Sequence, residues 1–457
     1  MKVIVKSWRV LHYLIIILVI LGFSLACLAE QPVPQKLTID QAIRTAMENS
    51  LQRQAVQGDV NVARDKMRQA LSAYGPKITI DCGYNHYNEV PATVQLNQGL
   101  VDMNNALLPV TGASYLQRPD DSLNYYGYQL KLTQPLYTGS KLTATKNAAK
   151  ANEKNAQANL DATDNDLVLS VKKAYYTVLL CQQLGVTMDE AVASMEKHLA
   201  EANAYYKVNI VTKLDVLRAE EKLADLKQKQ LLAQNNLALA KTSLNYLLGV
   251  DLGTNYSCED SLGYGPILED LNSCQNVALA QRPELASINA KIEMARQGVV
   301  IAKSGKKPTV ALVANDYHFK PENEAPSTTI GIVATFDLFD SGMVSHRIAE
   351  AEEILKQAQT GKELLQRGIK LEVEQAYRNV QVSLQTIDVA RKSIDTAKEA
   401  LGVAETRYKV GLSTSLERLD AEVGLTVAKT NYTQALSMYR IAIAELDRAM
   451  GKQPEGN

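Results

Sequence analysis

The segment Tyr206-Lys207-Val208 recurs 202 residues later as Tyr408-Lys409-Val410, and the agreement extends on both sides of it. At the same offset, identical residues begin at Val171, Ala174, Tyr175, Thr212, Leu214, Leu217, Ala219, Glu220 and Gly249. A long repeat with one constant offset indicates two copies of a domain-sized unit rather than a solenoid of short repeats. We therefore predict a first repeat at residues 30–250, a linker at 251–273, a second repeat at 274–451 and a short tail at 452–457.

Both copies show the same order of elements: one helix, two strands and then two long helices. In the first copy we expect a helix at 38–73, strands at 77–87 and 123–136, and helices at 141–206 and 213–248, with Gly249 as a C-cap. In the second copy we expect a helix at 274–303, strands at 308–319 and 328–339, and helices at 343–409 and 413–450.

The strands carry alternating apolar and polar residues. Ile78, Ile80 and Tyr84 alternate with polar neighbours in the first strand, and Ile330 and Ile332 do so in the last. The lengths and the alternation fit tilted strands of a membrane barrel, although a sheet packed on a soluble core would show the same pattern. The third strand, at 310–319, alternates poorly.

Four strands are too few to close a barrel around a pore, and a sheet that spans lipid cannot keep open edges. Three chains would supply twelve strands, which is enough for a lumen. The sequence therefore predicts a mixed α/β membrane protein: a homotrimer whose twelve-stranded β-barrel, four strands per chain, continues into an α-helical coiled-coil barrel.

The long helices carry a near-heptad apolar seam. Its members in the last long helical pair are Ile369, Val373, Ala376, Val380, Leu384, Ile387, Ala390, Ile394, Ala397, Leu401, Ala404 and Tyr408. A plain bundle of long helices would show this periodicity too. It does not explain why strands are inserted twice at matching places.

Residues 1–29 resemble a signal peptide. Lys2, Lys6 and Arg9 precede an apolar run, and Ala29 provides a small-residue cleavage site. A retained membrane helix is the alternative, but the apolar run is shorter than the ~20 residues that a bilayer requires. A third alternative makes Cys27 a lipidated first residue. Export predicts an outer-membrane location with a large periplasmic part.

Charge and cysteine content exclude several classes of protein. The 49 basic and 50 acidic residues nearly balance, so the chain offers no electrostatic footprint for nucleic acid. Cys258 and Cys274 lie close in sequence and could form a disulfide after export, or could equally stay unpaired. No cysteine and histidine spacing indicates a metal site, and we predict no cofactor. GxxxxGK[ST], HExxH, GxSxG and GxGxxG motifs are all absent, so we predict no enzymatic activity.

With its duplicated element order and its two tip segments, 206–220 and 408–422, the chain resembles the TolC family of outer-membrane factors. The resemblance covers nearly the whole mature chain. It implies a trimeric channel whose helical tips meet a periplasmic adaptor, which links the channel to an inner-membrane pump. The implied docking residues at these tips are Tyr206, Val208, Asn209, Tyr408, Val410, Gly411 and Leu412. Asn209 stands where the second tip has Gly411, but asparagine also tolerates a positive φ.

The resemblance further implies an acidic ring at the constricted tip, formed by Asp215, Glu417 and Asp420. The alternative is that these acids merely favour the starts of their helices through the helix dipole. The family's best-known gate has an arginine where this chain has Ser413, so a different residue, Arg418 or Lys213, would have to lock the gate.

We therefore expect a passive exit duct of a tripartite efflux or type I secretion system. The alternative is a periplasmic coiled-coil adaptor or scaffold without a pore. The sequence does not reveal the cargo, the partner pump or the role of the long segment 88–121.

Overall fold

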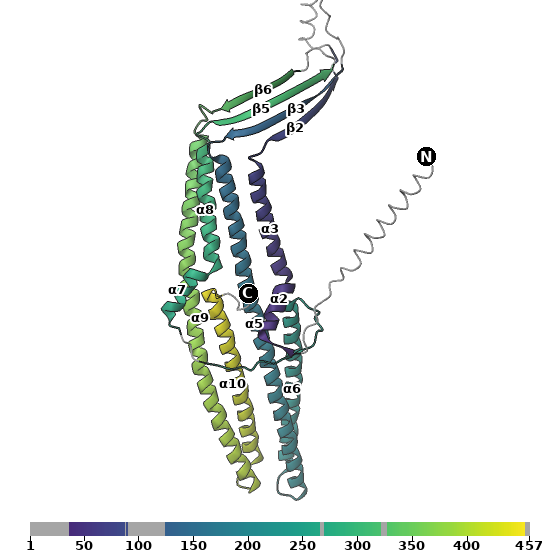
Figure 1. Cartoon of the computed structure of the whole chain (residues 1–457). Coiled ribbons are helices and arrows are strands. Elements are labelled where there is room, and N and C mark those ends of the chain that lie inside the picture. The colour runs from purple at the N-terminus through teal and green to yellow at the C-terminus, as the bar shows by residue number, and fades with distance from the viewer. Residues whose placement is uncertain (1–35, 87, 90–123, 266–268, 321–326, 453–457) are drawn as a thin grey trace, which may run out of the picture.

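The computed structural model describes residues 36–86, 88–89, 124–265, 269–320 and 327–452, so residues 1–29, Cys27 and nearly all of segment 88–121 lie outside the described residues. The molecule is elongated, with a sheet at one end and helices along the rest (Figure 1). The elements are β1 (Lys36–Leu37), α2 (Ile39–Asn49), α3 (Leu51–Ser72), β2 (Lys77–His86), β3 (Asn124–Tyr137), α5 (Lys141–Lys207), α6 (Lys213–Leu248), β4 (Ser257–Cys258), α7 (Leu271–Gln281), α8 (Pro283–Ser304), β5 (Thr309–Lys320), β6 (Ser327–Thr335), α9 (Met343–Lys409) and α10 (Ser415–Met450).

Two helices run the whole length of the helical part. α5 and α9 each have 67 residues, which corresponds to about 100 Å at ~1.5 Å per residue. α3 and α8 accompany them on the side of the sheet, whereas α6 and α10 accompany them to the other end (Figure 1). There each long helix turns into its shorter partner, and the two hairpin ends form what we call the tips.

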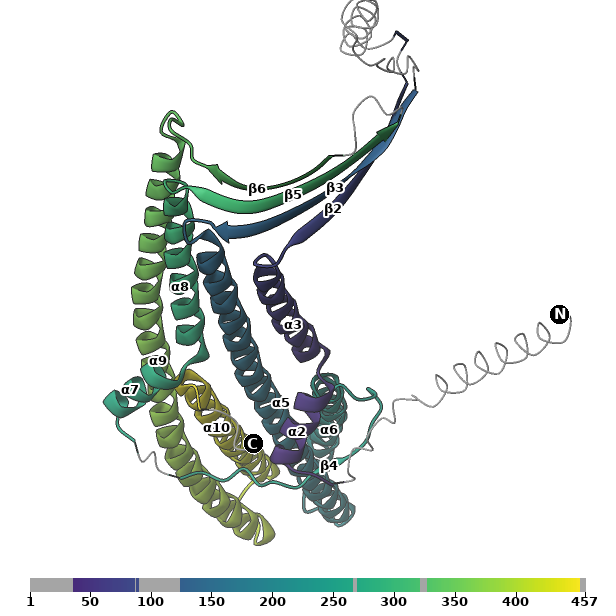
Figure 2. The same ribbon diagram turned by 45° about the horizontal axis from the view of Figure 1, so that its top comes forward.

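The four strands form one curved antiparallel sheet in the order β2-β3-β5-β6 (Figure 2). The register pairs Ile80 with Leu130 and Ala314 with Ile330, so the pleat collects apolar side chains on one face. The large exposed members of this face are Ile78, Ile80, Tyr84, Tyr126, Tyr128, Leu130, Ile330 and Ile332. Polar residues such as Thr79 and Lys131, which pair with each other, occupy the opposite face.

Two details of the sheet concern the strands predicted from the sequence, namely the poor alternation of β5 and the end of β6. The poorly alternating strand β5 pairs on both sides, with β3 and with β6, so its place in the sheet is fixed by its neighbours. The last strand ends at Thr335, and the prediction that it continues to residue 339 is wrong. Within the described residues, β2 and β6 each pair on one side only.

The two helices predicted at 38–73 and 274–303 are both broken, which corrects their expected continuity. Ser50 is extended at φ −60°, ψ 117°, ends α2 and caps α3 with its hydroxyl. Arg282 is extended at φ −64°, ψ 124° because Pro283 follows it, and proline disfavours a helical residue before it. α7 begins at Leu271, three residues before the predicted start of the second repeat.

The core consists of two main clusters at the middle of the molecule. One joins β1, α2, α5 and the end of α6, and the other joins α7, α9 and α10. Of the predicted seam, Ile369, Val373 and Val380 are almost completely buried, which confirms that part of the prediction. The seam members nearer the tip, such as Ile394 and Leu401, are only half-buried.

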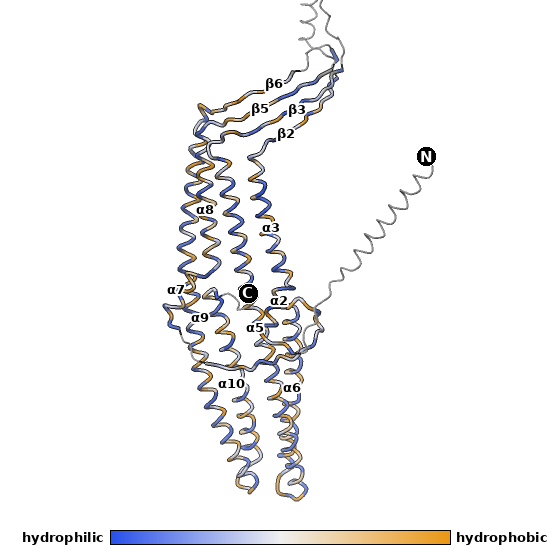
Figure 3. Tube along the Cα trace, in the orientation of Figure 1, coloured by the Kyte–Doolittle hydropathy of each residue, from blue (hydrophilic) through white to orange (hydrophobic). Residues whose placement is uncertain are grey.

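Apolar and polar residues are interspersed along the helices (Figure 3). None of the helices in the described part of the chain has an apolar stretch that could cross a membrane.

Candidate functional site: the two helical tips

The two tips have nearly the same backbone geometry. Asn209 has φ +58° and Gly411 has φ +73°, and each amide donates to a tyrosine carbonyl three residues earlier, at Tyr206 and Tyr408, over 3.0 Å. A hydroxyl then caps each following helix, from Thr212 in the first tip and from the equivalent threonine in the second. Asparagine therefore adopts the left-handed conformation that glycine adopts in the other copy.

Apolar side chains are exposed at both tips. Val208 and Ile210 are 62% and 67% exposed in the first tip, and Val410 and Leu412 are 64% and 70% exposed in the second. Water-exposed aliphatic groups at the end of a helical hairpin are typical of a surface that a partner covers.

Tyr408, one of the predicted docking residues, lies differently from its counterpart in the first tip. Its counterpart Tyr206 is 39% exposed, but Tyr408 is only 7% exposed because its ring packs inward. The His198 ring lies at 5.6 Å and the Arg418 guanidinium lies over the Tyr408 ring at 5.6 Å. The Tyr408 ring therefore packs inside the tip, whereas the Tyr206 ring is partly exposed.

The three candidate gate acids occupy different settings. Asp215 caps its own helix, since its carboxylate accepts from the Thr212 amide at 2.9 Å and from the Thr212 hydroxyl at 2.7 Å. These hydrogen bonds lower the pKa of Asp215. Glu417 and Asp420 are exposed, and neither carboxylate has a hydrogen bond or an ion pair with any described residue. Asp215 therefore stabilises the start of its own helix, whereas the carboxylates of Glu417 and Asp420 remain available for a ring.

A buried ion pair joins the two hairpins just behind the tips. Arg418 of α10 is 3% exposed and donates to Glu201 of α5 at 2.6 Å, with Glu405 of α9 at 3.7 Å. Of the two candidates for a locking residue, the structure thus places Arg418 between the hairpins. Lys213 lies instead over the ring of Tyr206, at 5.8 Å.

Two further titratable groups are buried beside this ion pair, and neither was identified from the sequence. Burial, assisted by the charge of Arg418, lowers the pKa of His198 to about 4. The His198 Nε2 lies 3.2 Å from the Ser415 hydroxyl oxygen. Burial raises the pKa of Glu422, and the nearby Ser194 hydroxyl and Arg418 charge only partly oppose this shift. No local pattern marks these residues, because the contact joins positions 217 residues apart in sequence.

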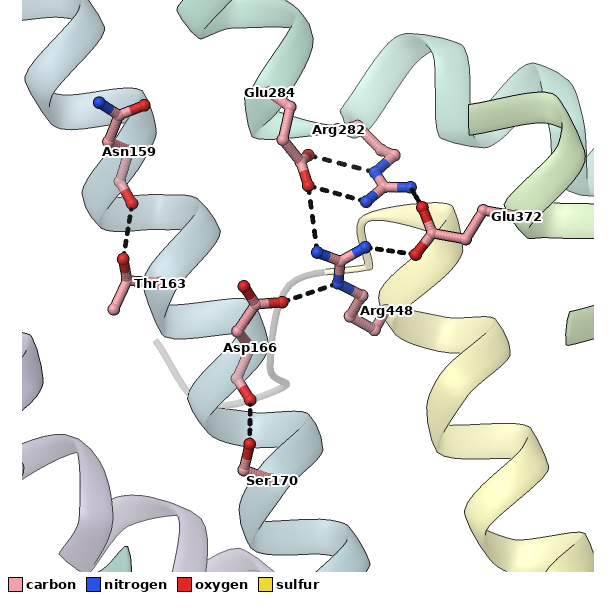
Figure 4. Close-up of polar contacts among 8 residues, drawn as sticks. All are labelled: Asn159, Thr163, Asp166, Ser170, Arg282, Glu284, Glu372 and Arg448. Carbon is pink, nitrogen blue, oxygen red and sulfur yellow. Dashed lines mark hydrogen bonds and ion pairs between the residues drawn. The ribbon is translucent and has the colours of Figure 1, made fainter. Parts of the chain in front are cut away.

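A second ionic cluster lies at mid-height, where the hairpins meet the α7–α8 break (Figure 4). Arg448 of α10 donates to Asp166 of α5 at 2.8 Å and lies 3.4 Å from Glu284 of α8. Arg448 and Arg282 both donate to Glu372 of α9. This cluster ties four long elements together, so we regard it as the fixed point from which the hairpins extend to the tips.

The structure shows no bond between Cys258 and Cys274. Both are free thiols, and each lies in a different core cluster, so the alternative of unpaired cysteines is the correct one. Burial raises the pKa of Cys258 to about 11, which keeps the thiol protonated and unreactive at neutral pH. Among the described residues, no three His, Cys, Asp or Glu side chains come together in a way that could hold a metal.

Comparison with known proteins gives relatives along almost the whole chain. Outer membrane protein TolC of Vibrio cholerae is 23% identical over 421 residues, covering 90% of this chain and 90% of that protein. TolC of Escherichia coli is 22% identical over 417 residues, covering 86% and 78%.

Solved structures show the same fold. The outer membrane protein VceC of V. cholerae matches with a TM-score of 0.75 and 19% identity over 90% of this chain and 96% of that one. The CmeC outer membrane channel of Campylobacter jejuni matches with a TM-score of 0.75 and 16% identity over 92% and 87%. The fold is thus that of outer-membrane channels in which a β domain continues into a helical barrel.

The family comparison agrees with these relatives. A sequence model of the outer membrane efflux protein family matches residues 42–250 and 275–452. Members of this family are channels, which confirms the prediction that the chain is not an enzyme. The chain belongs to the outer membrane efflux protein family.

Proposed function

We propose that this chain is the outer-membrane exit duct of a tripartite efflux or type I secretion system. It is a passive conduit that receives cargo from an inner-membrane pump through a periplasmic adaptor. The observation that carries the proposal is the sheet: one face exposes a band of large apolar side chains, and that sheet continues directly into helices about 100 Å long. Lipid is the environment that suits such a face.

The duct is formed by a homotrimer. A single chain leaves the outer edges of β2 and β6 without a neighbour in the described residues, and open edges are not tolerated in lipid. Three four-stranded sheets joined edge to edge give twelve strands and a lumen. Export of the chain by residues 1–29 brings it to the periplasm and then to the outer membrane.

An internal duplication produced the two hairpins. α5 and α9 each have 67 residues, and α6 and α10 each have 36, which supports the constant offset found in the sequence. Each chain therefore presents two similar tips to the periplasm.

The tips are both the docking surface and the gate. The exposed aliphatic groups Val208, Ile210, Val410 and Leu412 meet the adaptor. Asp420 and Glu417, repeated by three-fold symmetry, line the narrow end, and the Arg418–Glu201 ion pair holds the two hairpins of a chain together behind it.

The experiment that tests this proposal is reconstitution of the purified full-length protein into planar lipid bilayers. The proposal predicts discrete current steps in these bilayers. In washed membrane fractions from cells, it predicts that the protein stays with the outer membrane. The runner-up function, a periplasmic adaptor or scaffold without a pore, predicts no current and release of the protein by washing. The exposed apolar face of the sheet argues against that second function.

A further inference from the structure

The apolar face of the sheet changes character along its strands. The part nearer the helices carries aliphatic side chains: Ile78, Ile80, Leu130, Leu132, Leu312, Ala314, Ile330 and Ile332. Toward the strand ends that lie away from the helices (Figure 2), the same face carries polar and aromatic side chains: Tyr84, His86, Asn124, Tyr126, Tyr128, Asp316, His318 and Thr328. Counted outward from the aliphatic residues, each strand changes from one kind to the other only once.

The line between the two kinds of side chain crosses the strands at an angle. It passes through the first polar position on β6, β5, β3 and β2, namely Thr328, Asp316, Tyr128 and Tyr84. Thr328 pairs with Asp316, but Tyr128 pairs with His318, two residues further along β5. Tyr84 pairs with Tyr126, two residues further again along β3. From β6 to β2 the line therefore shifts by four residues while it crosses three strand spacings.

This angle has a simple geometric meaning. Four residues correspond to ~13 Å along a strand, and three spacings to ~14 Å across the sheet. The line is therefore level when the strands are tilted by about 43° from the barrel axis, because the tangent of the tilt is the ratio of these two lengths. Strands of outer-membrane barrels are tilted by about 35–45°. A level boundary between apolar and polar side chains is what the surface of a membrane requires.

The polar side of the line begins with a hydrogen-bonded pair. The Nε2 atom of His318 lies 3.0 Å from one carboxylate oxygen of Asp316, and the Thr328 hydroxyl donates to the other at 2.7 Å. The His318 ring stacks on the Tyr128 ring at 4.9 Å. The side chains of Asp316 and His318 are 32% and 39% exposed. Charged groups on the lipid face of a barrel are costly within the hydrocarbon and far less so near its boundaries, so this pair belongs at a boundary.

We propose that this line marks the outer limit of the membrane hydrocarbon, and that the Asp316–His318 pair beside it binds the phosphate of a lipid headgroup. This inference rests on the proposed function. It adds the residues that set the depth of the barrel in the membrane and that contact a lipid there.

The geometry of His318 suits a phosphate. An imidazole with both nitrogens protonated donates two hydrogen bonds. Nε2 faces Asp316, and Nδ1 has no hydrogen-bond partner among the described residues. The stacking on Tyr128 and the contact with Asp316 together fix the direction of the ring. A phosphate oxygen that accepts from Nδ1 makes a charge-assisted hydrogen bond with a group already held in place.

The neighbouring surface favours a lipid over free phosphate. Leu130 pairs with Asp316 across the two strands and is 41% exposed. On the other side of the pair, Ile330 lies two residues from Thr328 and is 75% exposed. An acyl chain attached to the bound headgroup therefore meets apolar surface directly beside the phosphate.

Cysteine labelling in whole cells tests the position of the line. Single cysteines are placed two residues apart on the same face, as Thr328→Cys and Ile330→Cys on β6 and as Tyr128→Cys and Leu130→Cys on β3. All four variants also carry Cys82→Ala and Cys181→Ala, because these native thiols are not buried. The reagent is a charged maleimide that does not cross membranes, and labelling after denaturation confirms that every thiol is present.

We expect the thiols at 328 and 128 to react and those at 330 and 130 to be protected. The matched control within each pair is its other member, since the two positions differ only in depth. Equal rates of labelling within both pairs overturn the boundary. Discrete currents in planar bilayers together with equal rates reject the boundary alone, whereas absent currents together with equal rates reject the channel as well.

Lipid binding by the purified oligomer tests the phosphate site, with phosphatidylglycerol as the probe and native mass spectrometry as the readout. His318→Phe keeps a ring that can stack on Tyr128 but removes both nitrogens. We expect it to weaken binding by at least about tenfold, because one charge-assisted hydrogen bond is lost. Asp316→Asn, which keeps the shape of the side chain and removes its charge, should weaken binding in the same direction.

The matched control is Lys131→Met, which removes a cation from the opposite face of the sheet at a similar depth. It should leave lipid binding unchanged. Equal binding by the parent and His318→Phe, or equal loss in His318→Phe and Lys131→Met, overturns the site. Displacement of the lipid by millimolar inorganic phosphate overturns the assignment to a lipid, since it shows that the acyl chains add nothing.

Discussion

At the contact between α5 and α10, the guanidinium group of Arg418 lies among carboxylates in a setting that is nearly free of solvent. Glu201 accepts a hydrogen bond from it, Glu405 lies at 3.7 Å, and the aromatic face of Tyr408 lies below it. A buried ion pair contributes little net stability compared with apolar packing, but breaking one leaves a buried charge without a partner.

We predict that Arg418→Met loosens the contact between the hairpins by about 1–3 kcal/mol, because the Glu201 and Glu405 side chains that lose their partner are 30% and 36% exposed and remain in reach of water. The measurement is hydrogen exchange of the amides in α5 and α10 near the tips. Arg378→Met is the matched control, because Arg378 pairs with Glu374 at the surface, where such a pair contributes about 0.3–0.5 kcal/mol. If the amides of α5 and α10 are equally protected in the two variants, Arg418 does not hold the two hairpins together.

The His198 imidazole gives the same contact a dependence on pH. Its pKa of about 4 lies below the ordinary value of about 6.5, so the packed state prefers the neutral ring. The stability that this provides is fully present above about pH 6.5 and is lost as the pH falls through about 4. Hydrogen exchange at pH 7.5 and at pH 5 gives the free energy of local opening at this contact. We predict that acid lowers this free energy by about 1–2 kcal/mol less in His198→Phe than in the parent protein.

The matched control for His198 is His346→Phe, which removes an exposed histidine at the sheet end of α9. Glu422 titrates in the parent and in both variants, so its contribution cancels in the comparison. A parent protein and a His198→Phe variant with the same dependence on pH would exclude His198 as the acid-sensitive group.

At the scale of the elements, the two tip turns depend on one residue each with a positive φ. Gly411 has φ +73°, and a side chain there would meet open space, so the cost of substitution comes from the backbone alone. We predict that Gly411→Val strains the turn by about 1–2 kcal/mol and weakens efflux while the oligomer still assembles. Gly411→Asn should be tolerated, because Asn209 holds the same position in the first tip.

The measurement is the resistance of cells to toxic compounds at matched amounts of assembled protein. The control is Gly402→Val, which also enters open space but lies within α9, where φ is negative. If Gly411→Val and Gly402→Val cells are equally resistant, the second tip does not need its left-handed turn for transport.

Local sequence signals predict some of the element boundaries and miss others. The bounds of α9 and the start of each tip turn follow from local signals, namely periodicity, a glycine or asparagine, and a threonine cap. The breaks at Ser50 and Arg282 were missed because an amphipathic pattern continues across them, although Ser50 is a strong cap and Pro283 constrains its neighbour. Tyr206 and Tyr408 have the same local sequence but different burial, because only Tyr408 faces α5 and Arg418.

In the proposed trimer, three-fold symmetry brings two exposed acids of each chain together as a ring. Asp420 and Glu417 are three residues apart and share a side of α10. Carboxylates around a narrow opening concentrate negative potential, so cations are favoured and multivalent cations bind and block. We predict that Glu417→Ala with Asp420→Ala weakens block by a trivalent cation by at least about tenfold, equivalent to about 1.4 kcal/mol.

Single-channel conductance provides the measurement, and Asp395→Ala with Glu399→Ala, which removes the same charge higher on α9, is the control. Asp215 should contribute less, because its carboxylate caps its own helix. Unchanged block in the double variant would mean that Glu417 and Asp420 are only helix-start residues.

One chain cannot form the proposed duct alone, and we propose that three chains share it. It follows from the sheet order β2-β3-β5-β6, in which each outer strand pairs on one side only among the described residues, and from the apolar face of that sheet. The most direct test is the mass of the protein extracted from the outer membrane into detergent, measured by native mass spectrometry. We expect one species with the mass of three chains, and a stable monomer or dimer would rule out the shared barrel.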